Sequence, residues 1–285
     1  MKKLFLLLFA VTFLSCSSDD TNNDEQSGNE VLNISKLTQT SNGRIFIRYY
    51  NEDGTIIKEL GMNVGDNEAN RPYTLYEYDN QKNLKNLKFY SANGDFIRDY
   101  RAYEYDSNNR LIKLTDSGDG APDPYITTFT YSNNRVDFEE TISEKVGSII
   151  FDAKGRIIET NHQSSPSGLT THFIKYNADN QVTEISDASG TTYNYETNDT
   201  SNPLFQFFIS KPMQYMLSEH HLYDIDFTFD TSYSVNNVTK FIVSQNNLPV
   251  GTEETTFQSN SNNYPIGSTT VRINGSIIER TFEYY

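Results

Sequence analysis

The chain contains no tryptophan, a single cysteine and only four histidines among its 285 residues. With one cysteine, Cys16, no disulfide can form within the chain. Basic residues are also scarce, because 23 Lys and Arg stand against 38 Asp and Glu, a formal net charge of −15 at pH 7. Nucleic-acid-binding surfaces are basic, so this balance argues against nucleic acid as a partner. The negative charge suits solubility in a crowded anionic envelope.

Recognisable catalytic motifs are missing as well. The sequence has no Gly-x-Ser-x-Gly motif and no glycine-rich phosphate loop before a helix. Its 38 acidic residues offer accidental carboxylate pairs, so a carboxylate-based hydrolase stays open as an alternative, but none of them stands in a motif. We therefore predict no enzyme, no catalytic residues and no cofactor.

Residues 1–15 have the order of a signal peptide: two lysines, an apolar run over residues 4–14, and the small residue Ser15 before Cys16. The run is too short to remain as a membrane span. The Phe-Leu-Ser-Cys sequence that ends at Cys16 resembles the lipobox of bacterial lipoproteins. The resemblance implies cleavage before Cys16 and its acylation, for example with palmitate, which would hold the protein at the outer membrane. The alternative is an ordinary secretory signal with a chance cysteine.

Residues 16–30 contain no large apolar side chain, so they cannot bury enough surface to offset their ordering entropy. We predict that they form a disordered acidic tether. Its Cys-Ser-Ser-Asp-Asp start resembles the surface-export signal of Bacteroidota lipoproteins. That resemblance implies a domain facing the cell exterior, and a spacer facing the periplasm is the alternative.

The stretch from Tyr103 to Leu114 carries the pattern that recurs over most of the chain. Tyr103 and Tyr105 stand at period 2, which places both rings on one face of a strand. Asp106 can accept hydrogen bonds from the backbone of a turn, and Asn109 can adopt positive φ with little strain. Leucine and β-branched residues then start a return strand. The unit therefore predicts a β-hairpin.

Close copies of this unit follow aromatic anchors at a quasi-regular spacing. The steps between anchors are 28, 27, 26, 20 and 25 residues, which is typical of a repeat architecture. The anchors are Tyr50, Tyr78, Tyr105, Tyr131, Phe151 and Tyr176. The residues expected to hold the turns are Asp79, Asp106, Asn109, Asp152, Gly155, Arg156 and Asn180.

The copy from Phe151 to Ile157, Phe-Asp-Ala-Lys-Gly-Arg-Ile, resembles the YD (Rhs-type) repeat. The resemblance covers roughly residues 44–196 well and residues 230–285 loosely. In several copies Asn replaces the Gly, and Ser or Asn replaces the Asp. The resemblance therefore implies a β-hairpin architecture more than a shared biochemistry.

The whole pattern predicts an all-β protein, an antiparallel meander of repeated hairpins that forms a curved sheet or an open barrel-like shell. One short helical insert is expected near 204–219. Residues 31–285 are expected to form a single repetitive domain. Its parts are the YD-like repeats over about 44–196, an insert at 202–226 and C-terminal strands at 227–285.

The insert is rich in apolar residues without clean period 2, and Pro212 suits the first position of a short helix. We interpret it as a plug over an open end or face of the sheet, with a docking surface as the alternative. In the tail, the hairpin from Val271 to Ile278 leads into a strand that stays apolar on one face to the last residue. We therefore expect the C-terminus to be paired in the sheet. Insert and tail together resemble uncharacterised lipoproteins common in Bacteroidota.

Two clusters are weak metal candidates. Asp116, Asp119 and Asp123 surround two glycines, as in a calcium loop, but they lack the EF-hand spacing and suit an ordinary turn. His220 and His221 lie near acidic residues, but they would point to opposite sides of an extended chain. We expect no metal site at either place.

These observations favour a non-enzymatic, surface-exposed outer-membrane lipoprotein with a structural, adhesive or ligand-binding role. Its expected partners are the outer membrane, through acylated Cys16, and a glycan or protein ligand. The alternative is a carbohydrate-binding accessory lipoprotein of a nutrient-uptake system. An exposed row of tyrosines on one sheet face would favour that alternative, and the absence of tryptophan opposes it. Charged residues interrupt the strands every few positions, which disfavours a sheet that spans the bilayer.

Overall fold

The computed structural model describes residues 32–118, 123–142, 145–164, 168–203 and 236–285. In these ranges the chain forms β-strands and one short 3-10 turn, η1 (Glu68–Asn70), so the all-β prediction is confirmed. The leader, the tether and the helical insert expected near 204–219 lie outside the described residues. Of the expected plug at 202–226, only Asn202 and Pro203 are described.

Most strands are six to ten residues long. In chain order they are β1 (Ile34–Ser41), β2 (Arg44–Tyr50), β3 (Ile56–Asn63), β4 (Tyr73–Tyr78), β5 (Leu84–Tyr90), β6 (Phe96–Tyr105), β7 (Leu111–Asp116), β8 (Tyr125–Ser132), β9 (Arg135–Glu140), β10 (Val146–Phe151), β11 (Ile157–Ser164), β12 (Gly168–Tyr176), β13 (Val182–Asp187), β14 (Thr191–Ser201), β15 (Asn236–Gln245), β16 (Leu248–Ser259), β17 (Pro265–Val271) and β18 (Ile277–Tyr284).

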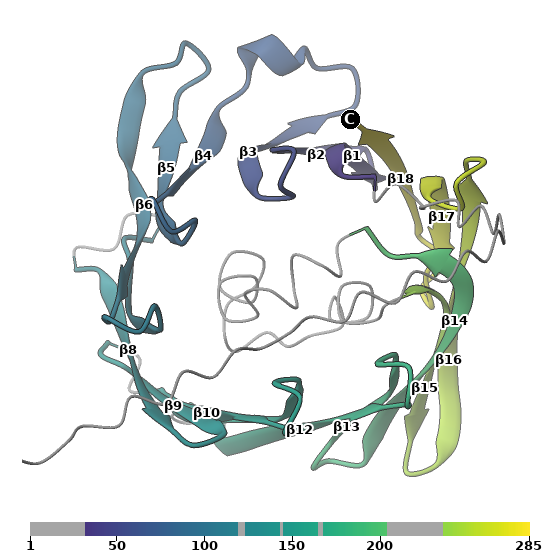
Figure 1. Cartoon of the computed structure of the whole chain (residues 1–285). Helices are drawn as coiled ribbons and strands as arrows, with labels where there is room; N and C mark the ends of the chain where they lie inside the picture. The colour runs from purple at the N-terminus through teal and green to yellow at the C-terminus, as the bar shows by residue number, and fades with distance from the viewer. Residues whose placement is uncertain (1–31, 119–122, 143–144, 165–167, 204–235) are drawn as a thin grey trace, which may run out of the picture. The chain divides into compact units, whose positions relative to one another are not determined.

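The strands form one antiparallel sheet of 18 strands in which every strand pairs with its neighbours in sequence. The sheet closes because β18 also pairs with β1, with Phe282 opposite Leu37 and Tyr284 opposite Ile34. The strands therefore follow one another around a ring (Figure 1). The sequence predicted a curved sheet or an open shell, and the structure shows a closed one. Closure covers the strand edges that an open sheet would expose.

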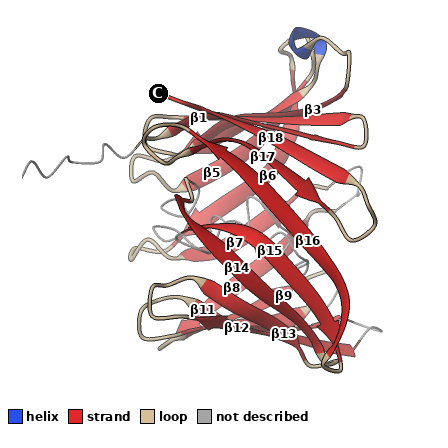
Figure 2. Cartoon of the chain, turned by 90° about the vertical axis from the view of Figure 1, so that its right-hand side faces the viewer, coloured by secondary structure: helices blue, strands red, loops and turns tan. Residues whose placement is uncertain are grey.

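The C-terminus is paired in the sheet, as the apolar pattern of the last strand predicted. Because consecutive strands are antiparallel, the turns divide between two ends of the sheet (Figure 2). We call the end where β1 begins and β18 ends the terminal rim; it also carries the turns that follow even-numbered strands. The other end is the opposite rim.

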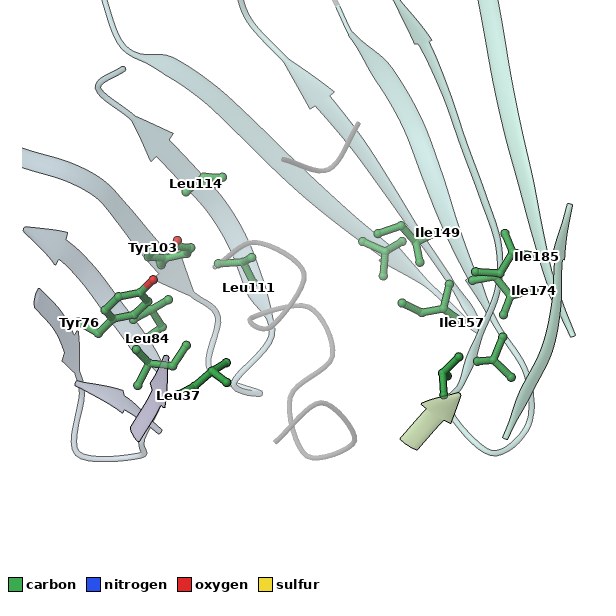
Figure 3. Close-up of a cluster of buried hydrophobic side chains, with 14 of the residues drawn as sticks. Leu37, Tyr76, Leu84, Tyr103, Leu111, Leu114, Ile149, Ile157, Ile174 and Ile185 are labelled. Atoms are coloured by element: carbon green, nitrogen blue, oxygen red, sulfur yellow. The ribbon is translucent and has the colours of Figure 1, made fainter. Parts of the chain in front are cut away.

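The register places buried side chains of neighbouring strands on the same face. Tyr103 pairs with Leu114 and Ile174 with Ile185, and all four are at most 8% exposed. Side chains on the concave face of a closed sheet converge, so this buried face is the inner one. Figure 3 shows its side chains in two groups, one from β1 and β4–β7 and the other from β10–β13. Each fully buried Leu or Ile stabilises the fold by about 1.5–3 kcal/mol.

The inner face changes character along several strands, of which β6 is an example. In β6, Tyr105 and Tyr103 lie toward the terminal rim, and Arg101 and Arg98 lie toward the opposite rim. The apolar cluster therefore gathers near the terminal rim, and a belt of polar side chains lies beyond it. The outer face carries the alternate residues of the same strands.

Candidate functional site

The repeat turns are held by one hydrogen-bond pattern. Asp79, Asp106 and Asp152 each accept backbone N–H bonds of 2.8–2.9 Å from the residues two and four positions later. Asn177 makes the same two contacts at 3.0 and 2.9 Å, so Asn serves in place of Asp. The residue three positions after each of them has positive φ, as at Lys82, Asn109, Gly155 and Asn180.

Arginines add a second set of contacts to two of these turns. The Nε of Arg156 donates to Asp152 at 2.7 Å, and another guanidinium nitrogen donates to Oδ1 of Asn180 in the next repeat at 2.9 Å. The same guanidinium lies 4.4 Å from the ring centre of Tyr176. Hydrogen bonds from the backbone and side chain of Arg110 lower the pKa of Asp106. Neighbouring turns are thus tied to one another along the terminal rim.

Several tyrosines at the ends of strands contact the preceding repeat. Three of the anchors, and Tyr284 at the equivalent place in the last strand, donate their hydroxyls to the carbonyl of the first residue of the preceding return strand, at 2.7–2.9 Å. The pairs are Tyr78 with Ile56, Tyr105 with Leu84, Tyr176 with Ile157, and Tyr284 with Pro265. Burial raises the pKa of all four hydroxyls, so they stay protonated donors. The period of the sequence reflects this contact between repeats, which the pattern alone did not reveal.

The polar belt of the inner face contains buried ion pairs. The Nε of Arg101 donates to Asp116 at 2.7 Å, and both side chains are at most 15% exposed. Arg48 donates to Glu59 at 3.0 Å through Nε, and the Tyr76 hydroxyl donates to the same carboxylate at 3.2 Å. Each of these two carboxylates is thus held in place by an arginine on the neighbouring strand.

The calcium candidates do not come together in the described residues. Asp116 forms the ion pair with Arg101 and accepts the backbone N–H of Gly118 at 2.9 Å. Asp123 is exposed, and Asp119 lies outside the described residues. Within the described ranges, no three His, Cys, Asp or Glu side chains gather closely enough to hold a metal ion. His220 and His221, like Cys16, also lie outside them.

The outer face is lined by cross-strand ion pairs. Lys88 pairs with Glu77 at 2.8 Å, and a hydrogen bond from this lysine lowers the pKa of Glu77. The same arrangement recurs around the ring for Lys36 with Glu283, Lys113 with Glu104, Lys175 with Glu184, and Lys240 with Glu196. An exposed pair contributes about 0–1 kcal/mol, so the main effect of these charges is a hydrated surface.

One stretch of the outer face departs from this arrangement. The ammonium of Lys58 lies 5.7 Å from the ring centre of Tyr49 and 4.6 Å from that of Tyr73. The rings of Tyr73 and Tyr90 are stacked with their centres 5.3 Å apart, and those of Tyr90 and Phe96 form a T-shaped pair at 5.8 Å. We call these five residues, on consecutive strands β2 to β6, the aromatic stripe. The sequence did not predict it, because its members come from different copies of the repeat.

In the part of the chain that the structure describes, no helix is long and apolar enough to cross a membrane.

No protein-family model and no curated protein sequence matches the chain. Several solved structures are similar in fold. A porin-like protein from Bacteroides uniformis is 14% identical, with a TM-score of 0.46, over 88% of this chain and 98% of that one. A porin-like protein from Bacteroides vulgatus is 11% identical, with a TM-score of 0.41, over 89% and 99%. The Photorhabdus luminescens Tc holotoxin pore is 12% identical, with a TM-score of 0.29, over 84% of this chain and 14% of that one.

Proposed function

We propose that this protein is a non-enzymatic lipoprotein of the outer membrane, anchored by acylated Cys16, whose closed sheet stands in water on the cell exterior. Its role is structural, adhesive or ligand-binding. The proposal combines the lipobox-like sequence with the chemistry of the sheet's outer face.

The observation that carries the proposal is the ring of charges on the outer face. Pairs such as Lys113 with Glu104 and Lys175 with Glu184 place charged groups on neighbouring strands toward the terminal rim, and Lys240 with Glu196 places them near the middle of β15 and β14. Placing a lysine at the midplane of a bilayer on such a face costs about 2–4 kcal/mol. A surface of this kind favours water, so attachment to a membrane would rest on the acyl chains, each buried CH₂ contributing about 0.8 kcal/mol.

The non-enzymatic part of the proposal has separate support. A glycosidase needs one carboxyl group with a raised pKa beside a second carboxylate. On the inner wall, Asp116 and Glu59 are instead each paired with an arginine. Such groups suit a fixed polar network better than proton transfer.

A second candidate function is carbohydrate binding in a nutrient-uptake system. The aromatic stripe favours it, because Tyr49, Tyr73 and Tyr90 form a row on one face of the sheet, the outer one. Aromatic rings and phenol hydroxyls are the groups that present an apolar surface and a polar tip to a ligand.

Protease treatment of intact cells tests the main proposal. We expect proteinase K to remove the native protein from whole cells, and Cys16→Ala to leave the membrane fraction. A periplasmic marker protein that stays intact is the control for envelope integrity. Protection of the native protein until the outer membrane is permeabilised would contradict the exterior location. A Cys16→Ala protein that remains with the membranes would contradict the lipid anchor.

A further inference from the structure

We propose that the aromatic stripe is a binding site for an acidic polysaccharide, one whose sugar units carry carboxylate groups. Lys58 would pair with a carboxylate of the ligand, while Tyr73, Tyr90 and Phe96 contact its sugar rings. The inference names a ligand class for the carbohydrate-binding candidate above. It rests on the proposed function only in requiring that the outer face of the sheet is exposed to water.

Lys58 differs from most lysines in the strands of the outer face; Lys85 in β5 also has no carboxylate within 4.0 Å, but among the described residues it has no cation–π contact with a ring. Five others, Lys36, Lys88, Lys113, Lys175 and Lys240, lie within 4.0 Å of a carboxylate. Among the described residues, Lys58 has no such partner and is held between the rings of Tyr49 and Tyr73. Cation–π contacts orient an ammonium group but leave its N–H donors available for an oxygen ligand. A carboxylate from outside the chain would complete the pairing that the neighbouring strands already have.

The rest of the stripe offers further contacts. The hydroxyls of Tyr73 and Tyr90 make no hydrogen bond to any described residue, unlike several anchor tyrosines of the repeat. Both side chains are partly exposed, and Phe96 is 53% exposed. Two hydroxyls, an ammonium and an exposed ring are thus collected on four neighbouring strands. The hydroxyls of a sugar can hydrogen-bond to the tyrosine hydroxyls and the ammonium, and its C–H groups can pack against the exposed ring.

The length of the stripe favours a chain over a small molecule. Neighbouring strands lie about 4.8 Å apart, so the four steps from β2 to β6 span roughly 19 Å. An extended peptide is the less suitable occupant, because peptides commonly add to a free sheet edge and this sheet is closed. A polysaccharide that carries carboxylates is therefore the ligand class that fits both the length of the aromatic stripe and the positive charge of Lys58.

Binding of the full-length protein, purified from membranes in detergent, to surface-bound polygalacturonate, alginate, hyaluronan and chondroitin sulfate tests the proposal. We expect at least one of them to bind. Fully methyl-esterified polygalacturonate, which keeps the sugar chain but not its charge, is expected to bind at least about tenfold more weakly. Failure of all four acidic polysaccharides to bind, or equal binding of the neutral ester, would overturn the proposal.

Variants locate the binding on the stripe. Lys58→Ala is expected to weaken binding about tenfold and Lys58→Arg to retain most of it. Tyr90→Phe keeps the stacked ring and should weaken binding about threefold. The matched control is Lys113→Ala, which removes an outer-face lysine paired with Glu104 and should bind as the native protein does. Unchanged melting temperatures would show that the variants are folded.

Two results would contradict the assignment of the polysaccharide site to the aromatic stripe even if binding is observed. One is a Lys58→Ala protein that binds as tightly as the native one. The other is a polyglutamate peptide that binds as tightly as the polysaccharide and depends equally on Lys58, which would assign the site to acidic peptides. Because the assay uses purified protein, its failure leaves the cell-exterior location untouched, and failure of the protease experiment leaves this site untouched.

Discussion

At the residue scale, each repeat turn of this protein depends on two residues. One side-chain oxygen accepts two backbone N–H bonds, and one residue three positions later adopts positive φ. Gly155 and Asn109 occupy that position as expected, but so does Lys82, with φ of 60°. Its ammonium pairs with Asp53 at 2.6 Å in the preceding turn, a contact that helps to hold an unfavourable backbone.

Replacing Gly155 tests the turn directly. Gly155 has φ of 79°, and no atom lies within 4 Å of the Cβ that a larger residue would carry. Gly155→Val should therefore lower the free energy of unfolding through backbone strain alone, by about 1–2 kcal/mol. Gly155→Asn should cost less, because Asn109 and Asn180 occupy this position in other repeats. Urea unfolding of both variants gives the comparison, and equal stability of Gly155→Val and the native protein would contradict the turn assignment.

The turn carboxylates also make stability depend on pH. Contacts with Arg110 lower the pKa of Asp106 in the folded state below the unfolded value of about 3.9. Asp106 therefore stabilises the fold fully above that value, and its contribution is lost as the pH falls through the folded pKa. Asp106→Asn should remove this part of the acid sensitivity while keeping the turn, as Asn177 does. Melting temperatures between pH 7 and pH 2 should fall less steeply for the variant; identical curves would contradict the assignment.

At the scale of elements, each hairpin depends on the next one through its anchor tyrosine. The Tyr105 hydroxyl reaches the carbonyl of Leu84 at 2.8 Å, which joins β6 to the start of β5. Tyr131 occupies the same repeat position, but its hydroxyl makes no hydrogen bond to the described residues, and its ring lies 4.8 Å from the Arg110 guanidinium. The repeat thus keeps the ring at every anchor and varies what the ring contacts.

This difference supplies a matched pair of variants. Tyr105→Phe should reduce the free energy of unfolding by about 1 kcal/mol, because it removes one buried hydrogen bond and leaves the ring in place. Tyr131→Phe should change it by less than half as much. Chemical denaturation measures both, and equal losses for the two variants would show that the hydroxyl contact between repeats contributes nothing specific.

At the scale of the whole molecule, closure is the property on which the rest depends. The seam between β1 and β18 joins residues far apart in sequence, and the Nε of Arg280 donates to the side chain of Gln39 across it at 2.9 Å. The Tyr285 hydroxyl also donates to the backbone carbonyl of Tyr50. Without this seam the sheet would have two long free edges, which are sites for pairing with other molecules.

Opening the seam is expected to cause association. Removing residues 277–285 deletes β18 and leaves β17 and β1 without their shared neighbour. We expect the truncated protein to form dimers or aggregates in light scattering, whereas Phe282→Ala, which keeps the strand, should stay monodisperse but lose about 3–5 kcal/mol of stability. A truncated protein that remains as monodisperse as the native one would contradict the role of the seam.

The sequence by itself determined the strands and turns of this protein, because both depend on contacts between residues close in the chain. The period-2 aromatics, the Asp or Asn after each strand and the Gly or Asn three positions later are local features, and they predicted an antiparallel meander of hairpins. Only the tertiary structure decided closure, the inner ion pair of Arg101 with Asp116, and the aromatic stripe. These depend on the register and twist accumulated over many strands, which bring together residues that no local pattern relates.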